Sequence, residues 1–198
     1  MKNKVIFCNI TWMKDYDGNR ADKPQNGGKY IKEYGNGGEI RNFLPYNHYC
    51  YGYVMHYGQI HIEKYDDVFS NQSEMRNTTV IWVARKPNAR SVIVGWYRNA
   101  TVYREPGIIT DGNISLYDKD GSNVWQYDIK VKEEDAHLLP ADKRNFVMPR
   151  AQIVGQGKGM GRSNIWYAES EYAQTKIVPE VLKLSLIHIS EPTRLALI

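Results

Sequence analysis

The sequence predicts a mainly β protein of the α+β class, folded as a small barrel or as a strongly curved antiparallel sheet with a few short peripheral helices. Short runs of β-branched and aromatic residues alternate in period two along most of the chain. Turn-forming Pro, Asn and Gly residues separate these runs, and few segments have a helical pattern. Together these observations predict strands that follow one another through turns.

The elements can be placed in chain order. Strands are expected at residues 5–11, 38–43, 49–55, 59–64, 78–84, 91–97, 100–104 and 127–131, and a long polar loop follows the first. The two strongest strand signals, 78–84 and 91–97, are joined by turn-rich residues and predict a central hairpin. Short helices are expected at residues 69–77, 133–139 and 169–176.

Residues 184–198 are expected not to be natural protein. The segment from Leu184 to Arg194 matches the translation of a transposon adapter used in sequencing libraries, so it is excluded from fold reasoning. Residues 1–183 then form a single β-rich domain of ordinary size. We expect this domain to be the front part of a longer protein.

The composition bounds the class of protein. Lysine and arginine number 26 and aspartate and glutamate 22, so the net charge of +4 permits contact with a polyanion without requiring it. Cys8 and Cys50 lie in strand-like runs without metal-ligand spacing and are expected to be buried free thiols in a reducing cytoplasm. No apolar run approaches the roughly 18 residues of a membrane span, and we expect a cytoplasmic protein.

Motifs for nucleophilic, zinc-dependent or phosphate-loop chemistry do not occur, so no catalytic residue, metal or cofactor is assigned. His56 and His61 lie five residues apart, and a turn between strands is favoured over a metal site, which needs three or four ligands. The glycine-rich segment Gly155–Gly161 has two open interpretations. It is either a loop whose backbone N–H groups contact phosphate or a flexible surface loop.

The aromatic residues suggest a binding site. Fifteen Tyr and five Trp against four Phe can present flat faces at a surface, and such rings can hold an unstacked nucleobase while polar side chains bind its edge. Trp96 and Tyr97 are neighbours in one strand, so one is expected in the core and the other available. The stacking candidates are Trp12, Trp82, Trp96, Tyr97 and Trp166. The base-edge candidates are Asp15, Asn42, Asn99 and Asn164, and the phosphate-binding candidates are Arg144, Arg150, Lys158 and Arg162.

Five runs are distinctive: FCNITWM (7–13), GGKY (27–30), NFLPY (42–46), VGWYRNATVYR (94–104) and SNIWYA (163–168). They resemble a bacterial module of hypothetical proteins, some of which are associated with HNH-type endonucleases. A small β domain ahead of a nuclease is similar to modification-dependent restriction enzymes, whose PUA-like, EVE-like or SRA-like front domains bind a modified base. The resemblance implies a PUA-like barrel, a DNA partner, and a nuclease domain beyond Lys183.

Three functional hypotheses follow. The first is a DNA-binding domain that recognises a modified base, as the front part of a restriction-type defence endonuclease. The second is a small enzyme that binds a nucleotide or another anionic substrate through Gly155–Gly161. The third is a protein-interaction module without a ligand, whose aromatic residues form the core.

Overall fold

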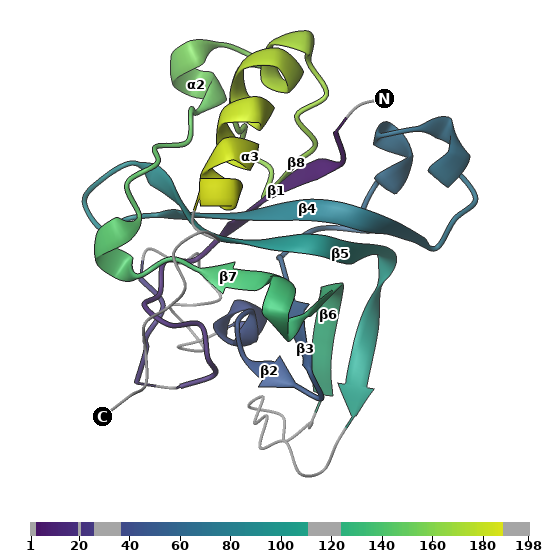
Figure 1. Cartoon of the computed structure of the whole chain (residues 1–198), viewed down its shortest axis with the longest axis vertical. Coiled ribbons are helices and arrows are strands. Elements are labelled where there is room, and N and C mark those ends of the chain that lie inside the picture. The colour runs from purple at the N-terminus through teal and green to yellow at the C-terminus, as the bar shows by residue number, and fades with distance from the viewer. Residues whose placement is uncertain (1–2, 20, 26–36, 111–123, 188–198) are drawn as a thin grey trace.

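The computed structural model describes residues 3–19, 21–25, 37–110 and 124–187. Within these residues, eight strands form one mixed sheet in the order β2-β3-β6-β5-β4-β1-β8, and β7 pairs with β5 beside that path (Figure 1). The strands are β1 (Val5–Ile10), β2 (Pro45–Tyr46), β3 (Tyr49–Gly52), β4 (Glu74–Arg85), β5 (Ser91–Thr110), β6 (Val124–Lys132), β7 (Ala136–Leu138) and β8 (Ile165–Trp166). The mainly β prediction is confirmed.

Helices in the described residues are few and short. The α-helices are α2 (Ala151–Val154) and α3 (Val178–Ile187), and the π-helical segment η6 (Ala173–Ile177) leads into α3. The 3-10 helices are η1 (Gly38–Arg41), η2 (Ile62–Lys64), η3 (Asp67–Phe69), η4 (Glu133–Asp135) and η5 (Ala141–Lys143). Figure 1 shows α3 lying against one face of the sheet, over β1 and β4.

The central hairpin is confirmed by β4 and β5, which pair antiparallel around the turn at residues 86–90. Residues 91–97 and 100–104, expected as two strands, both belong to the single strand β5. The pairing of β5 with β6 shifts register between Val102 and Gly107, and such irregularities bend a strand. The start of β5 therefore pairs with β4 and β7, whereas its end turns away and pairs with β6 (Figure 1).

The expected barrel is wrong. In the described residues the sheet is not closed, because β2 and β8 stand at the two ends of the strand order. The sheet is also mixed rather than antiparallel, since β1 pairs with β4 in parallel. A parallel neighbour needs a long connection, which the residues between β1 and β4 supply.

Four local expectations are also wrong. The strands expected at residues 38–43 and 59–64 are replaced by η1 and η2, and β4 already begins at Glu74 inside the helix expected at 69–77. The helix expected at 133–139 is reduced to η4, and the next residues form β7. Pairing of β7 with β5 outweighs the local helical pattern of an acidic segment, as tertiary contacts commonly do.

The helix expected at 169–176 is confirmed but is longer. Helical residues run without a break from Glu171 to Ile187, with Pro179 inside. Proline donates no backbone N–H, and the helix departs from α-helical hydrogen bonding over the π-helical segment that ends two residues before Pro179. Residues 184–187 continue α3, although they belong to the segment expected to be adapter-derived. Residues 188–198 and the run at 27–30 lie outside the described residues.

Both faces of the sheet are buried around β1, β4 and the start of β5. Alternate residues of β1 enter different cores, with Ile6 and Cys8 in an inner core and Phe7 in an outer core. The outer core lies under α3, which contributes Val178 and Val181. This double coverage decides which of the predicted site residues can reach a ligand.

Candidate nucleic-acid interface

The strongest stacking candidates lie inside the protein. Trp82, Trp96 and Tyr97 are 0%, 1% and 0% exposed. Trp96 and Tyr97 point to opposite faces, with Tyr97 in the inner core and Trp96 in the outer core. Because both faces are covered, neither ring is available, and the expectation that one would be is wrong. None of the three rings has an exposed face on which a base could stack.

The other two stacking candidates lie at the margins of the sheet. Trp12 is largely buried, and the guanidinium carbon of Arg144 lies 5.0 Å from its ring centroid. Trp166 is half-buried on the edge strand β8, with its ring centroid 4.9 Å from that of Phe7. Among the five predicted rings, Trp166 therefore keeps the most accessible surface.

Two of the base-edge candidates use their amides within the protein. The side chain of Asn42 is fully buried and binds the backbone of Tyr53 twice, donating to the carbonyl at 3.0 Å and accepting from the N–H at 2.9 Å. The Asn164 amide accepts from Asn9 at 3.2 Å and donates to the carbonyl of Met55 at 3.0 Å. These contacts fix loops to the sheet, so both amides have structural partners.

The remaining two edge candidates are separate surface residues. Asn99 donates to both carboxylate oxygens of Asp135 at 3.3 and 3.4 Å. Asp15 lies in the loop after β1, where Lys14 Nζ is 3.7 Å from its carboxylate. Each of the four predicted edge residues therefore contacts different groups of the protein, and no two of them share a contact.

Arg144 is not a phosphate-binding residue in this fold. Its side chain is 1% exposed, and its Nε and Nη1 donate to the carbonyls of Leu139 and Met13 at 2.8 and 2.6 Å. Nη2 donates to the carbonyl of Lys14. The guanidinium group therefore ties the segment after β7 to the segment after β1, and a phosphate has no access to it.

Three segments that carry cations do meet at one end of the β4–β5 hairpin. Val92 bridges Val147, and Arg150 bridges Met160, so the β4–β5 turn, the segment before α2 and the glycine-rich segment lie together. Arg150 Nη2 donates to the carbonyl of Gly161 at 2.7 Å. We define the basic surface as Arg85, Lys86, Arg90, Arg150 and Arg162.

The basic surface has no acidic counterpart in its own segments. No Asp or Glu occurs between Arg85 and Arg104 or between residues 143 and 168. In the part of the chain that the structure describes, no ion pair joins Lys86, Arg90 or Arg150 to a carboxylate. Partial burial lowers the pKa of Arg150, and the nearby charge of Arg85 lowers it further.

Sequence reasoning found Arg150 and Arg162 but missed the contribution of the β4–β5 turn. The absence of acidic residues over that stretch was the available signal. Lys158, the fourth phosphate candidate, is exposed but stands apart beside the C-terminal helix, with Nζ 5.5 Å from the ring centroid of Tyr172.

The glycine-rich segment is folded back on the protein. A Cβ at Gly159 would lie 2.4 Å from the carbonyl oxygen of Pro149, so only glycine fits there. Gly155 and Gly157 have φ of 98° and 77°, which side chains rarely adopt. The N–H groups of Gly155, Lys158 and Met160 donate to protein carbonyls. Packing thus accounts for Gly159 and backbone conformation for Gly155 and Gly157, and fewer N–H groups remain for an anion.

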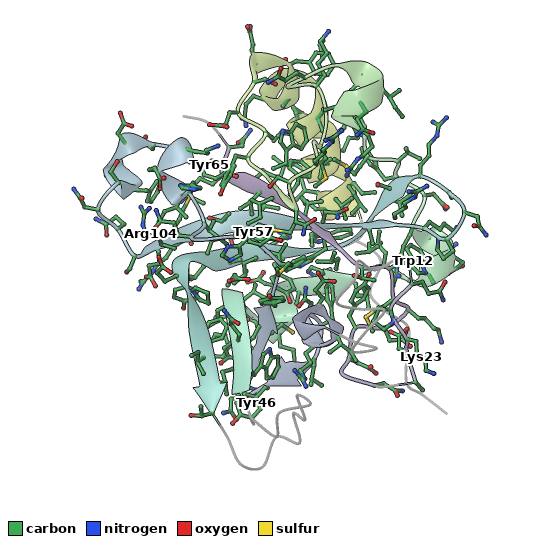
Figure 2. All side chains as sticks on the ribbon, turned by 180° about the vertical axis from the view of Figure 1, so that it is seen from behind. Trp12, Lys23, Tyr46, Tyr57, Tyr65 and Arg104 are labelled. Atoms are coloured by element: carbon green, nitrogen blue, oxygen red, sulfur yellow. The ribbon has the colours of Figure 1, made fainter. Side chains whose placement is uncertain are left out.

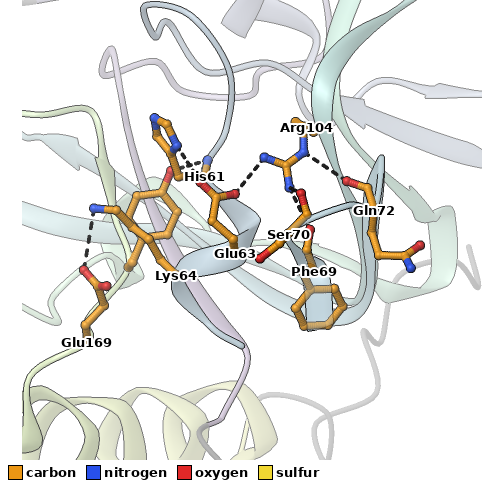
Figure 3. Close-up of polar contacts among 9 residues, drawn as sticks. His61, Glu63, Lys64, Phe69, Ser70, Gln72, Arg104 and Glu169 are labelled. Carbon is orange, nitrogen blue, oxygen red and sulfur yellow. Dashed lines mark hydrogen bonds and ion pairs between the residues drawn. The ribbon is translucent and has the colours of Figure 1, made fainter. Parts of the chain in front are cut away.

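A polar cluster that the sequence did not indicate surrounds Arg104 (Figure 3). Nη1 of Arg104 donates to Glu63 Oε2 at 2.7 Å, and Nε and Nη2 bind carbonyls between Phe69 and Gln72. The other oxygen of Glu63 lies 2.8 Å from Nδ1 of His61. Burial opposes ionisation of Glu63, but hydrogen bonds from its own backbone, His61 and Arg104 lower its pKa to about 2. The cluster fastens η2 and η3 to β5.

The two histidines considered as a pair bind different carboxylates. His56 Nε2 lies 3.0 Å from Asp128 Oδ1, whereas His61 binds Glu63. The hydrogen bond to Asp128 raises the pKa of His56. Among the described residues, no group of three or more His, Cys, Asp or Glu side chains could hold a metal ion.

Two further expectations concern the state of the cysteines and the presence of a membrane-spanning segment. Cys8 and Cys50 are buried free thiols, as expected, and burial raises the pKa of Cys50 to about 12. None of the helices in the described ranges has the length and apolar character needed to cross a membrane.

Comparison with known proteins adds no relative. No family model, no curated protein and no solved structure matches this chain. Function is therefore inferred from the geometry of the chain itself.

Proposed function

We propose that this chain binds duplex DNA and that the basic surface contacts its backbone phosphates. The observation that carries the proposal is the convergence of cations from three segments that contain no carboxylate of their own. Holding like charges together costs free energy, and an incoming polyanion offsets that cost. The proposal keeps the partner that the resemblance implies and gives the buried rings no contact with DNA.

Recognition of a modified base would need an accessible ring near the basic surface. Trp166 supports this finer proposal, because it is half-buried and lies four residues after Arg162. If Trp166 stacks on a base, Trp166→Ala should remove any preference for methylated over unmodified duplex. An equal preference in the variant would exclude Trp166 from that role.

The phosphate contacts can be tested by the salt dependence of binding. Each phosphate contact contributes about 0.9 to the slope of log K against log salt concentration for duplex DNA. We expect Arg90→Gln to weaken binding of a labelled duplex and to reduce this slope by roughly one, as measured by fluorescence anisotropy.

Arg76→Gln is the matched control. Arg76 is an exposed arginine near the opposite end of β4, about 30 Å from Arg85 at the usual rise per strand residue. The control should leave the slope unchanged. Absence of duplex binding at low salt, or equal effects of the two substitutions, would refute the proposal.

A further inference from the structure

A second surface with different chemistry lies at the far end of β5. Six aromatic rings from four strands gather there, and neighbouring ring centroids are 4.9–6.4 Å apart. We define the tyrosine surface as Tyr46, Tyr49, Tyr51, Tyr103, Tyr127 and Trp125. Tyr46 marks its position on β2 in Figure 2.

These rings form a layer with a buried base and an accessible top. Tyr51 and Trp125 are buried and form the centre of a small cluster separate from the inner and outer cores. Tyr46, Tyr49 and Tyr127 pack around them and are half-buried. Whereas α3 covers the outer face over β1 and β4, aromatic side chains form the layer over β3 and β6.

The rings are held in place before any ligand arrives. A Cβ at Gly107 would lie 2.3 Å from Cζ of Tyr127, so the ring of Tyr127 rests directly on the backbone of β5. Tyr51 meets Tyr127 edge to face at 4.9 Å, and Tyr103 meets Tyr127 edge to face at 5.6 Å. Burial raises the pKa of Tyr103 to about 12. Fixed rings lose little conformational entropy on binding.

Cations are interleaved with the rings. Lys130 Nζ lies 4.0 Å from the ring centroid of Tyr49 and 5.6 Å from that of Tyr51. The guanidinium carbon of Arg41 lies 6.0 Å from the ring of Trp125. No carboxylate in the described ranges forms an ion pair with Lys130. The surface therefore offers both flat rings and positive charge.

We propose that the tyrosine surface binds single-stranded nucleic acid, with unpaired bases stacking on Tyr46 and Tyr49 and with Lys130 moving from its place over the Tyr49 ring to neutralise a phosphate. Rings set flush in a sheet cannot enter the stack of a duplex, but splayed bases can lie on them. The charge of Lys130 favours this polyanion over a neutral partner. The surface is distinct from the basic surface, which lies at the opposite end of β5, where Arg90 directly precedes Ser91.

The test compares oligothymidine with an abasic oligonucleotide of the same length, which keeps the phosphates and lacks the bases. We expect the wild-type protein to bind oligothymidine more tightly than the abasic strand. Tyr49→Ala should weaken oligothymidine binding by about 5- to 150-fold, the range for loss of one stacked base, and should barely affect the abasic strand. Tyr49→Phe keeps the ring and should retain the affinity.

Folding and the two surfaces can be separated. Thermal unfolding of Tyr49→Ala and Tyr46→Ala shows whether each variant remains folded. If neither does, the wild-type preference for oligothymidine over the abasic strand still tests the proposal. Arg90→Gln should weaken duplex binding and leave the difference between oligothymidine and the abasic strand unchanged. Equal wild-type affinity for those two strands, or binding to neither, would overturn the proposal whatever the duplex result.

Discussion

Arg144 is the residue on which the segment after β1 depends most directly. Its guanidinium group satisfies three backbone carbonyls in a buried site, and it packs beside the ring of Trp12. Removing the group leaves these carbonyls without partners, at a cost of about 1–3 kcal/mol for each that stays dry. We expect Arg144→Met to lower the free energy of unfolding by roughly 2–4 kcal/mol in urea denaturation.

Lys143→Met provides the control, because Lys143 is the exposed neighbour of Arg144 and its substitution removes the same charge. Its effect should stay within about 0.5 kcal/mol. Equal stability of the two variants would contradict a structural role for Arg144.

His56 couples stability to pH. Its pKa is raised in the folded protein by Asp128, which is 1% exposed and also accepts from the N–H of Val54 at 3.0 Å. A raised pKa means that the folded state holds this proton more tightly than the unfolded chain does. The resulting stability is complete below the unfolded value of about 6.5 and is lost as pH rises through the folded value.

We therefore expect the difference in unfolding free energy between the wild type and His56→Gln to shrink as pH rises above about 6.5. Burial lowers the pKa of His137, which shifts stability in the opposite sense, so the difference between the two proteins is the quantity to measure. The charge of Glu105 also raises the pKa of His56, and Glu105 is present in both proteins. A difference that is constant from acidic to alkaline pH would contradict the assignment.

Residue identity alone led to the aromatic stacking candidates but did not show which rings are accessible. Trp82 and Tyr97 have the same strand-like neighbours as Tyr49, and only the coverage of each face separates them. The alternation of Tyr49 and Tyr51 along one strand was a usable signal, because alternate residues share a face. No such signal indicated that Arg144 is buried, since two of the carbonyls it binds are far away in the sequence.

At the scale of elements, two glycines of the glycine-rich segment test whether packing or ligand binding requires glycine there. Gly159 has no room for a side chain, whereas a Cβ at Gly161 would meet nothing within 4 Å. We expect Gly159→Ala to cost about 1–3 kcal/mol of unfolding free energy, because the strand-like bridge between Arg150 and Met160 must open. Gly161→Ala should be close to neutral in the same thermal or urea unfolding. Equal costs for both would point away from packing as the reason for Gly159.

Elements with strong β-branched runs were predictable, and weak ones were not. The hairpin of β4 and β5 follows from two apolar runs and a turn, so local sequence sufficed. Residues 38–43 and 59–64 alternate over too few positions to distinguish a strand from a 3-10 turn. Residues 136–138 form a strand because β5 offers them a pairing partner, and the local sequence pattern contains no information on that partner.

At the scale of the molecule, the class was predictable and the topology was not. The parallel pairing of β1 with β4 joins segments separated by more than sixty residues, and period-two alternation contains no information on such partners. The same pairing order places the basic surface and the tyrosine surface at opposite ends of β5. Neither surface is visible in the sequence as one continuous motif.

The two ends of the strand order have a consequence for association between copies. The bordering strands β2 and β8 are each two residues long, and Pro45 in β2 contributes no N–H. Long unpaired borders act as templates for strands of other chains, and very short ones containing proline do not. Within the described residues, these two borders therefore give a strand of another copy little unpaired backbone on which to add.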